Sequence, residues 1–111
     1  MSTVSTHVLD LTAGRPAAGV PVSLDIWSGG MWVPAGGSVT GADGRSTDLP
    51  PLDPDAPATA RLVFAVQDYL VASHGSAFYP QITIAFTAEP GEHYHVPLLL
   101  SPFGYSTYRG S

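Results

Sequence analysis

The chain contains no cysteine and no lysine among its 111 residues. Without cysteine, the protein has no disulfide, no thiolate metal site and no thiol nucleophile. All four of its basic residues are arginines, and they stand against nine carboxylates, which gives a formal net charge of −5. Such an acidic surface is unsuited to a phosphate backbone, so we expect no nucleic-acid partner.

Long apolar segments are also missing. No apolar run approaches the length that a membrane-spanning helix needs. The N-terminal residues Met-Ser-Thr-Val have neither the basic region nor the apolar region of a signal peptide. We therefore expect a cytoplasmic protein without a membrane partner.

Charge is scarce, at 12% of residues, whereas hydrophobic residues make up 44% and turn residues are abundant, with 12 glycines and 11 prolines. This balance favours a β-rich globule over a helical bundle or a disordered chain. The length suits a single domain over residues 1–111. The low charge also leaves apolar surface that is compatible with an oligomer.

Strand patterns dominate the chain. Apolar residues alternate with others at Val20, Val22, Leu24 and Ile26, a period of two that is typical of a half-buried strand. Similar apolar faces are predicted in the segments 61–66, 82–86 and 94–100, with a last short strand over 105–109. Turns are indicated at Gly29-Gly30, at Asp43-Gly44 and at 89–92.

The remaining segments are predicted to be less regular. Gly36-Gly37 is expected to loosen the chain, and the proline-rich residues 50–57 are expected to form a loop. The only predicted helix covers residues 67–73 and ends at Gly75. Short strands, frequent turns and one minor helix together predict an all-β two-sheet sandwich.

The C-terminal segment 93–111 is rich in residues that carry chemistry: two histidines, three tyrosines and an arginine. His93 and His95 lie two residues apart in a predicted strand, so both face the same side of the sheet. From spacing alone, three interpretations stay open: a hydrogen-bonded or solvated pair, an acid–base pair, or metal ligands.

Three other basic side chains carry no strong signal from their sequence context alone. His7 reads as a polar strand residue, and Arg45 as a surface arginine that becomes an anion clamp only inside a pocket. His74, at the end of the predicted helix, reads as a partner of the helix dipole.

Three separated blocks of the sequence resemble one known family. They are the first predicted strand from Ser5 to Asp10, Ser-Thr-His-Val-Leu-Asp; the turn Ala42-Asp43-Gly44-Arg45; and the whole segment 93–111, which closes with Tyr-Arg-Gly-Ser. In this order they resemble the 5-hydroxyisourate hydrolases, the transthyretin-related enzymes of purine catabolism. The closing tetrapeptide is the most specific block, because it is also C-terminal in that family.

The resemblance implies a transthyretin-like sandwich of about eight strands with one short helix, assembled as a homotetramer whose sites lie at the dimer–dimer interface. It implies a catalytic group of His7, Arg45, His95 and Ser111. It also implies substrate-binding roles for Tyr108, Arg109 and Gly110, and no catalytic role for His93. The stretches 29–37 and 50–57 differ from the family pattern, which affects only loop conformation.

The implied reaction opens a ring amide of 5-hydroxyisourate with water and gives 2-oxo-4-hydroxy-4-carboxy-5-ureidoimidazoline, a step of urate degradation. The His7–His95 pair is expected to take the proton of the water, with either member as the base. Ser111 is expected to orient one imidazole, and Arg45 to hold substrate oxygens. Arg109 either does the same or anchors the tail, and the scheme requires no cofactor and no metal.

The main alternative is a non-catalytic transthyretin-like small-molecule binding protein. Vertebrate transthyretins use the same fold to carry thyroid hormones in a hydrophobic channel. Their counterpart positions lack the set of histidine, arginine and Tyr-Arg-Gly-Ser that this chain carries, which favours the enzyme. Fold by itself does not separate the two functions.

Overall fold

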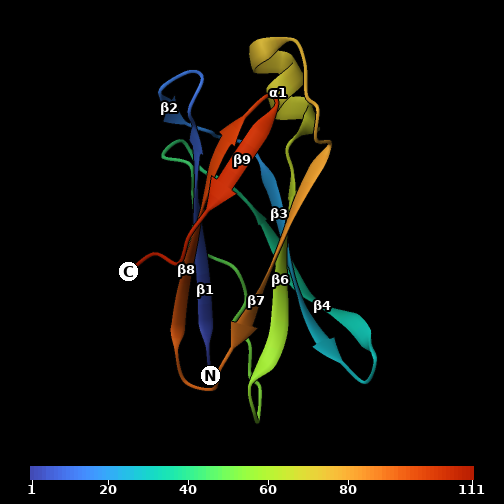
Figure 1. Cartoon of the computed structure of the whole chain (residues 1–111). Coiled ribbons are helices and arrows are strands. Elements are labelled where there is room, and N and C mark those ends of the chain that lie inside the picture. Colours follow the sequence, from blue (N-terminus) through green and yellow to red (C-terminus); the bar gives the residue numbers. More distant parts are fainter.

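The computed structural model describes all residues 1–111, which form two β-sheets packed face to face (Figure 1). The first sheet has the order β2-β1-β8-β9, with β5 also paired to β1. Its strands are β1 (Thr3–Asp10), β2 (Arg15–Pro16), β5 (Arg45–Ser46), β8 (His93–Ser101) and β9 (Gly104–Thr107). The predicted two-sheet sandwich is thereby confirmed.

The second sheet has the order β4-β3-β6-β7. Its strands are β3 (Pro21–Ser28), β4 (Met31–Val39), β6 (Ala58–Ala65) and β7 (Gln81–Ala88). Their side chains alternate as the sequence predicts: Val22, Leu24, Leu62 and Phe64 are buried, and they join a core of 19 buried hydrophobic residues between the sheets. Burial of one face of each sheet is the main force that holds the sandwich together.

Strands β1 and β8 form the centre of the first sheet and are parallel, unlike every other strand pair. Their register places Ser5 beside His95 and His7 beside Pro97. Side chains that are neighbours in this register point to the same face of the sheet. The N-terminal strand and the histidine-rich strand, about 90 residues apart in the chain, therefore share one outer surface.

The helix α1 (Gln67–His74) covers one end of the sandwich, as Figure 1 shows. It ends as predicted at Gly75, which adopts φ of 80° and donates its N–H to the carbonyl of Val71. His74 lies in the last turn, and its Nε2 is 2.7 Å from Oδ2 of the buried Asp10 on β1. With eight residues, this helix is not long and apolar enough to cross a membrane.

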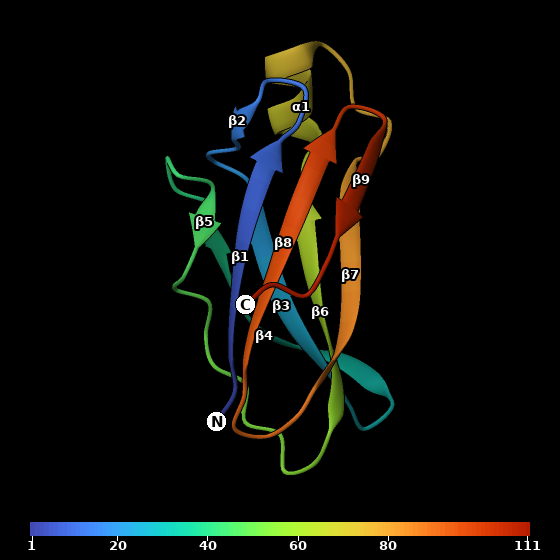
Figure 2. The same ribbon diagram turned by 60° about the vertical axis from the view of Figure 1, so that its left-hand side comes forward.

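The expectation that Gly36-Gly37 loosens the chain was wrong, and so was the predicted end of the last strand at Arg109. Strand β4 runs through Gly36 and Gly37 to Val39, because a register shift beside Leu24 keeps both glycines paired with β3. The last strand ends at Thr107, where its pairing with Leu98 of β8 is the last one, and not at Arg109. The tail then crosses the outer side of β8 toward β1 (Figure 2), and the N–H of Gly110 donates to the carbonyl of His95 at 2.7 Å.

Candidate active site

The polar outer face of the first sheet is built by alternation in β1 and β8. Along β1, Val4, Thr6 and Val8 are buried toward the core, so Ser5 and His7 face outward. Along β8, Tyr94 and Val96 are buried toward the core, so His93 and His95 face outward. The parallel register then gathers these four outward residues on one surface.

Arg45 joins this surface through β5. Its Cα pairs with that of His7 across antiparallel strands. The preceding Gly44 has φ of 75°, and a Cβ there would lie 2.9 Å from the Cβ of Pro16, so this turn requires glycine. Arg45 is exposed and takes part in none of the four ion pairs of the structure, which leaves its guanidinium free for an anionic ligand.

The imidazole of His95 is held on two sides. Its Nδ1 is 2.8 Å from Oγ of Ser5. On the opposite side, the backbone of Gly110 packs against the ring so closely that a Cβ on Gly110 would lie 2.5 Å from Cδ2 of His95. Its Nε2 makes no hydrogen bond within the chain, so this nitrogen is available to a ligand.

The surroundings of His95 keep its ring neutral. Burial lowers the pKa of His95 below its ordinary value, and the electrostatic effect of the charge on Arg45 and of the neighbouring imidazoles of His7 and His93 lowers it further. A neutral imidazole is the form that accepts a proton. His95 is therefore in the protonation state of a general base at neutral pH.

His7 is oriented by the turn before β5. Its Nε2 is 2.8 Å from the carbonyl oxygen of Asp43. A carbonyl oxygen only accepts, so this nitrogen carries a proton and donates it. In the neutral ring of His7, Nδ1 is then the nitrogen with the free lone pair, whereas Nε2 is committed to the turn.

A chain of hydrogen bonds continues from His95 along the face. Oγ of Ser5 also lies 3.2 Å from Nε2 of His93. The Nδ1 of His93 is in turn 2.6 Å from Oγ1 of Thr3. The two histidines on β8 are thus linked through a serine on β1, which the sequence analysis did not assign to the site.

The residues of the C-terminal tail contact two different surfaces of the protein. Gly110 lies on His95, and Ser111 follows it as an exposed residue without a hydrogen bond inside the chain. Arg109 lies on the other side: its guanidinium is 4.8 Å from the ring centre of Tyr94 and its Nη2 is 3.7 Å from Oε2 of Glu92. In this position Arg109 contacts Tyr94 of β8 and Glu92 just before it.

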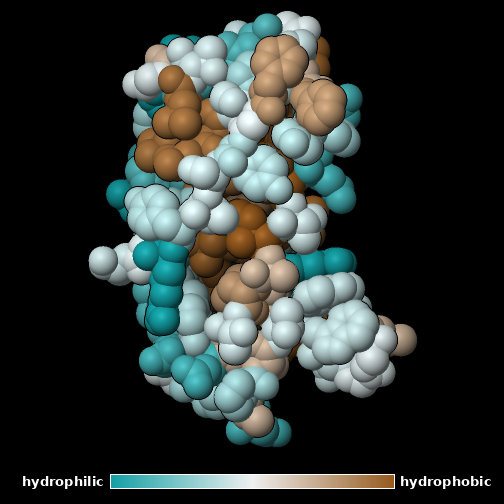
Figure 3. Space-filling model, in the orientation of Figure 1, coloured by the Kyte–Doolittle hydropathy of each residue, from teal (hydrophilic) through white to brown (hydrophobic).

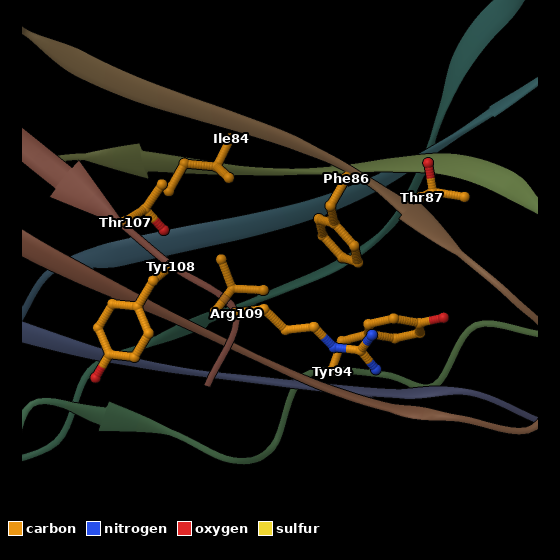
Figure 4. Close-up of a pocket in the computed structure, with 8 residues that line it drawn as sticks. Ile84, Phe86, Thr87, Tyr94, Thr107, Tyr108 and Arg109 are labelled. Carbon is orange, nitrogen blue, oxygen red and sulfur yellow. The ribbon is translucent and has the colours of Figure 1, made fainter. Parts of the chain in front are cut away.

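Arg109 lies at an apolar cleft of about 310 Å³ between the edges of the two sheets. Figure 3 shows it as an apolar hollow in the centre of one face, and Figure 4 shows Arg109 along Tyr94 while Tyr108 points away from both. The lining residues are Ile84, Phe86, Thr87, Tyr94, Val96, Thr107, Tyr108 and Arg109. The cleft and the histidine face are different surfaces.

The structure thus brings together four of the residues singled out from the sequence: His7, Arg45, His95 and Gly110. Ser111 lies next in the chain, while Tyr108 and Arg109 lie toward the cleft. Nowhere do three or more histidine, aspartate or glutamate side chains group as metal ligands. Sequence reasoning missed Ser5 and the Asp43 carbonyl, since only the pairing of β1 with β8 and β5 makes them neighbours of histidines.

Known proteins resemble the chain over nearly its full length. The model of the HIUase/Transthyretin family matches residues 4–110. A 5-hydroxyisourate hydrolase of Deinococcus radiodurans is 43% identical, over 97% of this chain and 95% of the relative. The uric acid degradation bifunctional protein TTL of Arabidopsis thaliana is 45% identical, over 97% of this chain, which spans only 37% of that longer protein.

Solved structures of both a hydrolase and a hormone-binding protein share the fold. The structure of Klebsiella pneumoniae 5-hydroxyisourate hydrolase superposes with a TM-score of 0.79 at 34% identity, over 100% of this chain and 94% of that one. Sea bream transthyretin in complex with thyroxine superposes with a TM-score of 0.89 at 27% identity, over 97% and 94%. The backbone fits both, so the side chains of the site have to distinguish the two functions.

Proposed function

The chain belongs to the HIUase/transthyretin family, and from this premise we propose that it is a 5-hydroxyisourate hydrolase. The observation that carries the proposal is the convergence of His7, Arg45 and His95 on the outer face of the first sheet, beside the tail at Gly110. A base, a free cation and a close backbone wall are the parts that hydrolysis of a polar, flat ring amide needs.

His95 is the general base in this proposal. Its Nε2 is unbonded and its lowered pKa keeps it neutral, while the Nε2 of His7 is committed to Asp43. Nε2 of His95 removes a proton from water as the water oxygen attacks the carbonyl carbon of the ring amide. The same nitrogen then returns the proton to the leaving ring nitrogen, and the C–N bond breaks.

Arg45 and His7 act on the oxygen side of the reaction. The guanidinium of Arg45 binds substrate oxygens in a bidentate manner and offsets the negative charge that develops on the attacked carbonyl. His7, adjacent to Arg45 in the strand register, places a second imidazole beside the substrate oxygens that Arg45 binds. No step of this scheme needs a metal or an organic cofactor.

Gly110 and Ser111 form the wall of the site next to His95. The contact between Gly110 and the imidazole sets the orientation of the ring. Ser111 extends beyond it, within the same tail segment, and contributes its hydroxyl or terminal carboxylate to a bound substrate. Arg109 supports this wall from the cleft side, through its contacts with Tyr94 and Glu92.

We further propose that residues 1–111 form a single domain that assembles as a homotetramer in the cytoplasm, with its sites at the dimer–dimer interface. The histidine face is open in the isolated protomer, and a second protomer across it would exclude water from the reaction. Exposed aromatic residues support self-association: Phe78 is 67% exposed, Phe103 71% and Tyr108 57%.

An ultraviolet assay tests the activity. Uricase converts urate to 5-hydroxyisourate, the protein is added, and the decay of the intermediate is compared with its spontaneous decay. We expect clear acceleration by the wild-type protein. In the variant His95→Asn, we expect a loss of about 10²- to 10⁴-fold in kcat, the usual contribution of a general base.

Unfolding temperature and molecular mass control the experiment, because His95→Asn should leave both close to wild type. If that variant turned over normally, His95 would not be the base. If the folded wild-type protein gave no acceleration at all, the alternative of a non-catalytic binding protein would become the leading interpretation, in line with the likeness to the thyroxine complex of sea bream transthyretin.

A further inference from the structure

We propose that Ser5, together with His93 and Thr3, sets the tautomer of His95 and so makes its Nε2 a proton acceptor. This inference rests on the proposed function and adds positioning residues to it. The geometry is the continuous chain from Nδ1 of His95 through Ser5 and His93 to Thr3, with distances of 2.8, 3.2 and 2.6 Å. It runs along the outer face from the candidate active site to the exposed start of β1.

The single proton of the Ser5 hydroxyl limits how the chain can be arranged. Ser5 is 9% exposed, and its hydroxyl has no neighbouring acceptor other than the two ring nitrogens. If it donates to His93, then Nδ1–H of His95 donates to Ser5. If it donates to His95, then Nε2–H of His93 donates to Ser5. An arrangement in which both rings donate leaves the serine proton unsatisfied.

Both rings therefore adopt the same tautomer in either satisfied arrangement. In the first, His95 and His93 are both protonated at Nδ1, and Nε2 of His95 presents a lone pair to the substrate. In the second, both are protonated at Nε2, and His95 presents an N–H that cannot take a proton from water. The first arrangement is the one that the proposed reaction uses, and it ends with Nδ1–H of His93 donating to Thr3.

A partner at Nδ1 matters because a free imidazole in water favours the Nε2–H form. The tautomer of a histidine is set by the hydrogen bond that its other nitrogen makes. Asp performs this task in the serine hydrolases, where the wrong tautomer costs about 10⁴-fold in kcat. In the proposed arrangement a neutral hydroxyl performs it: the Ser5 hydroxyl accepts from Nδ1–H of His95 and donates to Nε2 of His93, and no negative charge is present to raise the pKa of His95.

Nitrogen NMR tests the tautomer directly and without reference to activity. Long-range ¹H–¹⁵N spectra of the ¹⁵N-labelled wild-type protein, with the signals of His95 identified by their loss in His95→Asn, distinguish the two neutral forms. We expect the Nδ1–H form for both His95 and His93. In Ser5→Ala we expect His95 to shift to the Nε2–H form.

Kinetics of three variants test the consequence. Ser5→Ala should lower kcat by about 10- to 100-fold, less than the loss of an orienting carboxylate, while KM changes by less than about threefold. Ser5→Thr keeps the hydroxyl and should restore most of kcat, since Thr3 already makes the same kind of bond to His93. Ser106→Ala on β9, an exposed serine without a hydrogen bond to any histidine, is the matched control.

The proposal would be overturned by a neutral His95 in the Nε2–H form in the wild-type protein, which needs no variant to fold. It would also be overturned if Ser5→Ala kept both the tautomer and kcat. A wild-type protein with the Nδ1–H form but no hydrolase activity would overturn the proposed function instead. The NMR and kinetic results thus separate the two failures.

Discussion

At the scale of single residues, the position of the His95 ring depends on one glycine. The tail backbone can lie on the imidazole only because Gly110 has no side chain. The C-terminal motif therefore has a steric reason for its glycine, independent of any contact with substrate. The same closeness makes the site sensitive to one additional methyl group.

The variant Gly110→Ala should displace either the ring or the tail, since the new Cβ would lie 2.5 Å from Cδ2 of His95. We expect kcat/KM to fall by about 10- to 100-fold, because misplacement of a catalytic group by about 1 Å can cost that much. Steady-state kinetics and the unfolding temperature measure the effect. Gly104→Ala is the matched control, because its Cβ would meet nothing closer than Oγ of Ser101 at 3.8 Å, and it should be nearly silent.

The lowered pKa of His95 predicts the pH dependence of the reaction. A base must be neutral, so kcat/KM should fall as the pH drops through this pKa, with a midpoint below the ordinary 6.5 of histidine. In Arg45→Gln the loss of a positive charge should raise the pKa, so the midpoint should move to higher pH, in addition to weaker substrate binding.

A pH profile of kcat/KM for the two proteins measures both midpoints. The profile of Arg15→Gln serves as the control, because Arg15 lies on β2 and does not contribute to the pKa of His95. A midpoint that stayed in place in Arg45→Gln would mean that Arg45 does not act electrostatically on His95.

At the scale of elements, a buried carboxylate ties the helix to the first sheet. Asp10 at the end of β1 is 1% exposed and accepts hydrogen bonds from Tyr69 and His74 of α1, both at 2.7 Å, and from the backbone of Ala13 at 2.9 Å. Burial alone would raise the pKa of Asp10, but these hydrogen bonds outweigh it and lower the pKa below its usual value.

The variant Tyr69→Phe should lose about 1.5–3 kcal/mol of unfolding free energy at neutral pH, the range for a hydrogen bond to a charged group. A depressed carboxyl pKa gives stability that is present above its unfolded value of 3.8 and is lost as the pH falls through the folded value. The difference between Tyr69→Phe and wild type should therefore shrink at acid pH.

Urea unfolding at several pH values measures this difference. Tyr105→Phe is the control, because the hydroxyl of this exposed tyrosine makes no hydrogen bond within the chain. A destabilisation by Tyr69→Phe that stayed constant down to low pH would mean that the bond to Asp10 does not depend on the carboxylate charge.

At the scale of the whole molecule, the C-terminal tail connects two surfaces. Gly110 contacts His95 on the outer face, while Arg109 reaches Tyr94 and Glu92 beside the apolar cleft. Any assembly that covers the outer face meets this tail, so its removal should change the site more than the sandwich, whose core lies elsewhere.

Deletion of residues 108–111 should abolish hydrolysis and leave the far-ultraviolet circular dichroism of the protomer unchanged. Light scattering coupled to size-exclusion chromatography should give the intact protein a mass of about four times 11.6 kDa. A truncated protein with normal kcat would show that the tail is not part of the site, and an intact protein that stayed monomeric yet fully active would remove the dimer–dimer interface from the proposal.

The sequence by itself was sufficient for the sandwich, and it supplied the residues from which the candidate site is proposed. Period-two alternation in segments such as Val20–Ile26 predicts which side of a strand is buried, because side chains alternate across any sheet. Glycine and proline mark most of the turns for local conformational reasons. His7, Arg45 and His95 were identified by resemblance, through short motifs that this chain shares with the family.

Tertiary structure decided which strands are neighbours. That arrangement in turn determines which side chains become hydrogen-bond partners of the site histidines and of Asp10. Ser5 becomes the partner of His95 only through the parallel register of β1 and β8, and Asp10 meets Tyr69 and His74 only when α1 closes the end of the sandwich. Arg109 and Gly110 are consecutive in the sequence, but Arg109 contacts Tyr94 beside the cleft, whereas Gly110 contacts His95 on the outer face. Alternation is a local property of a chain, whereas register and docking depend on contacts between distant segments, which no local pattern records.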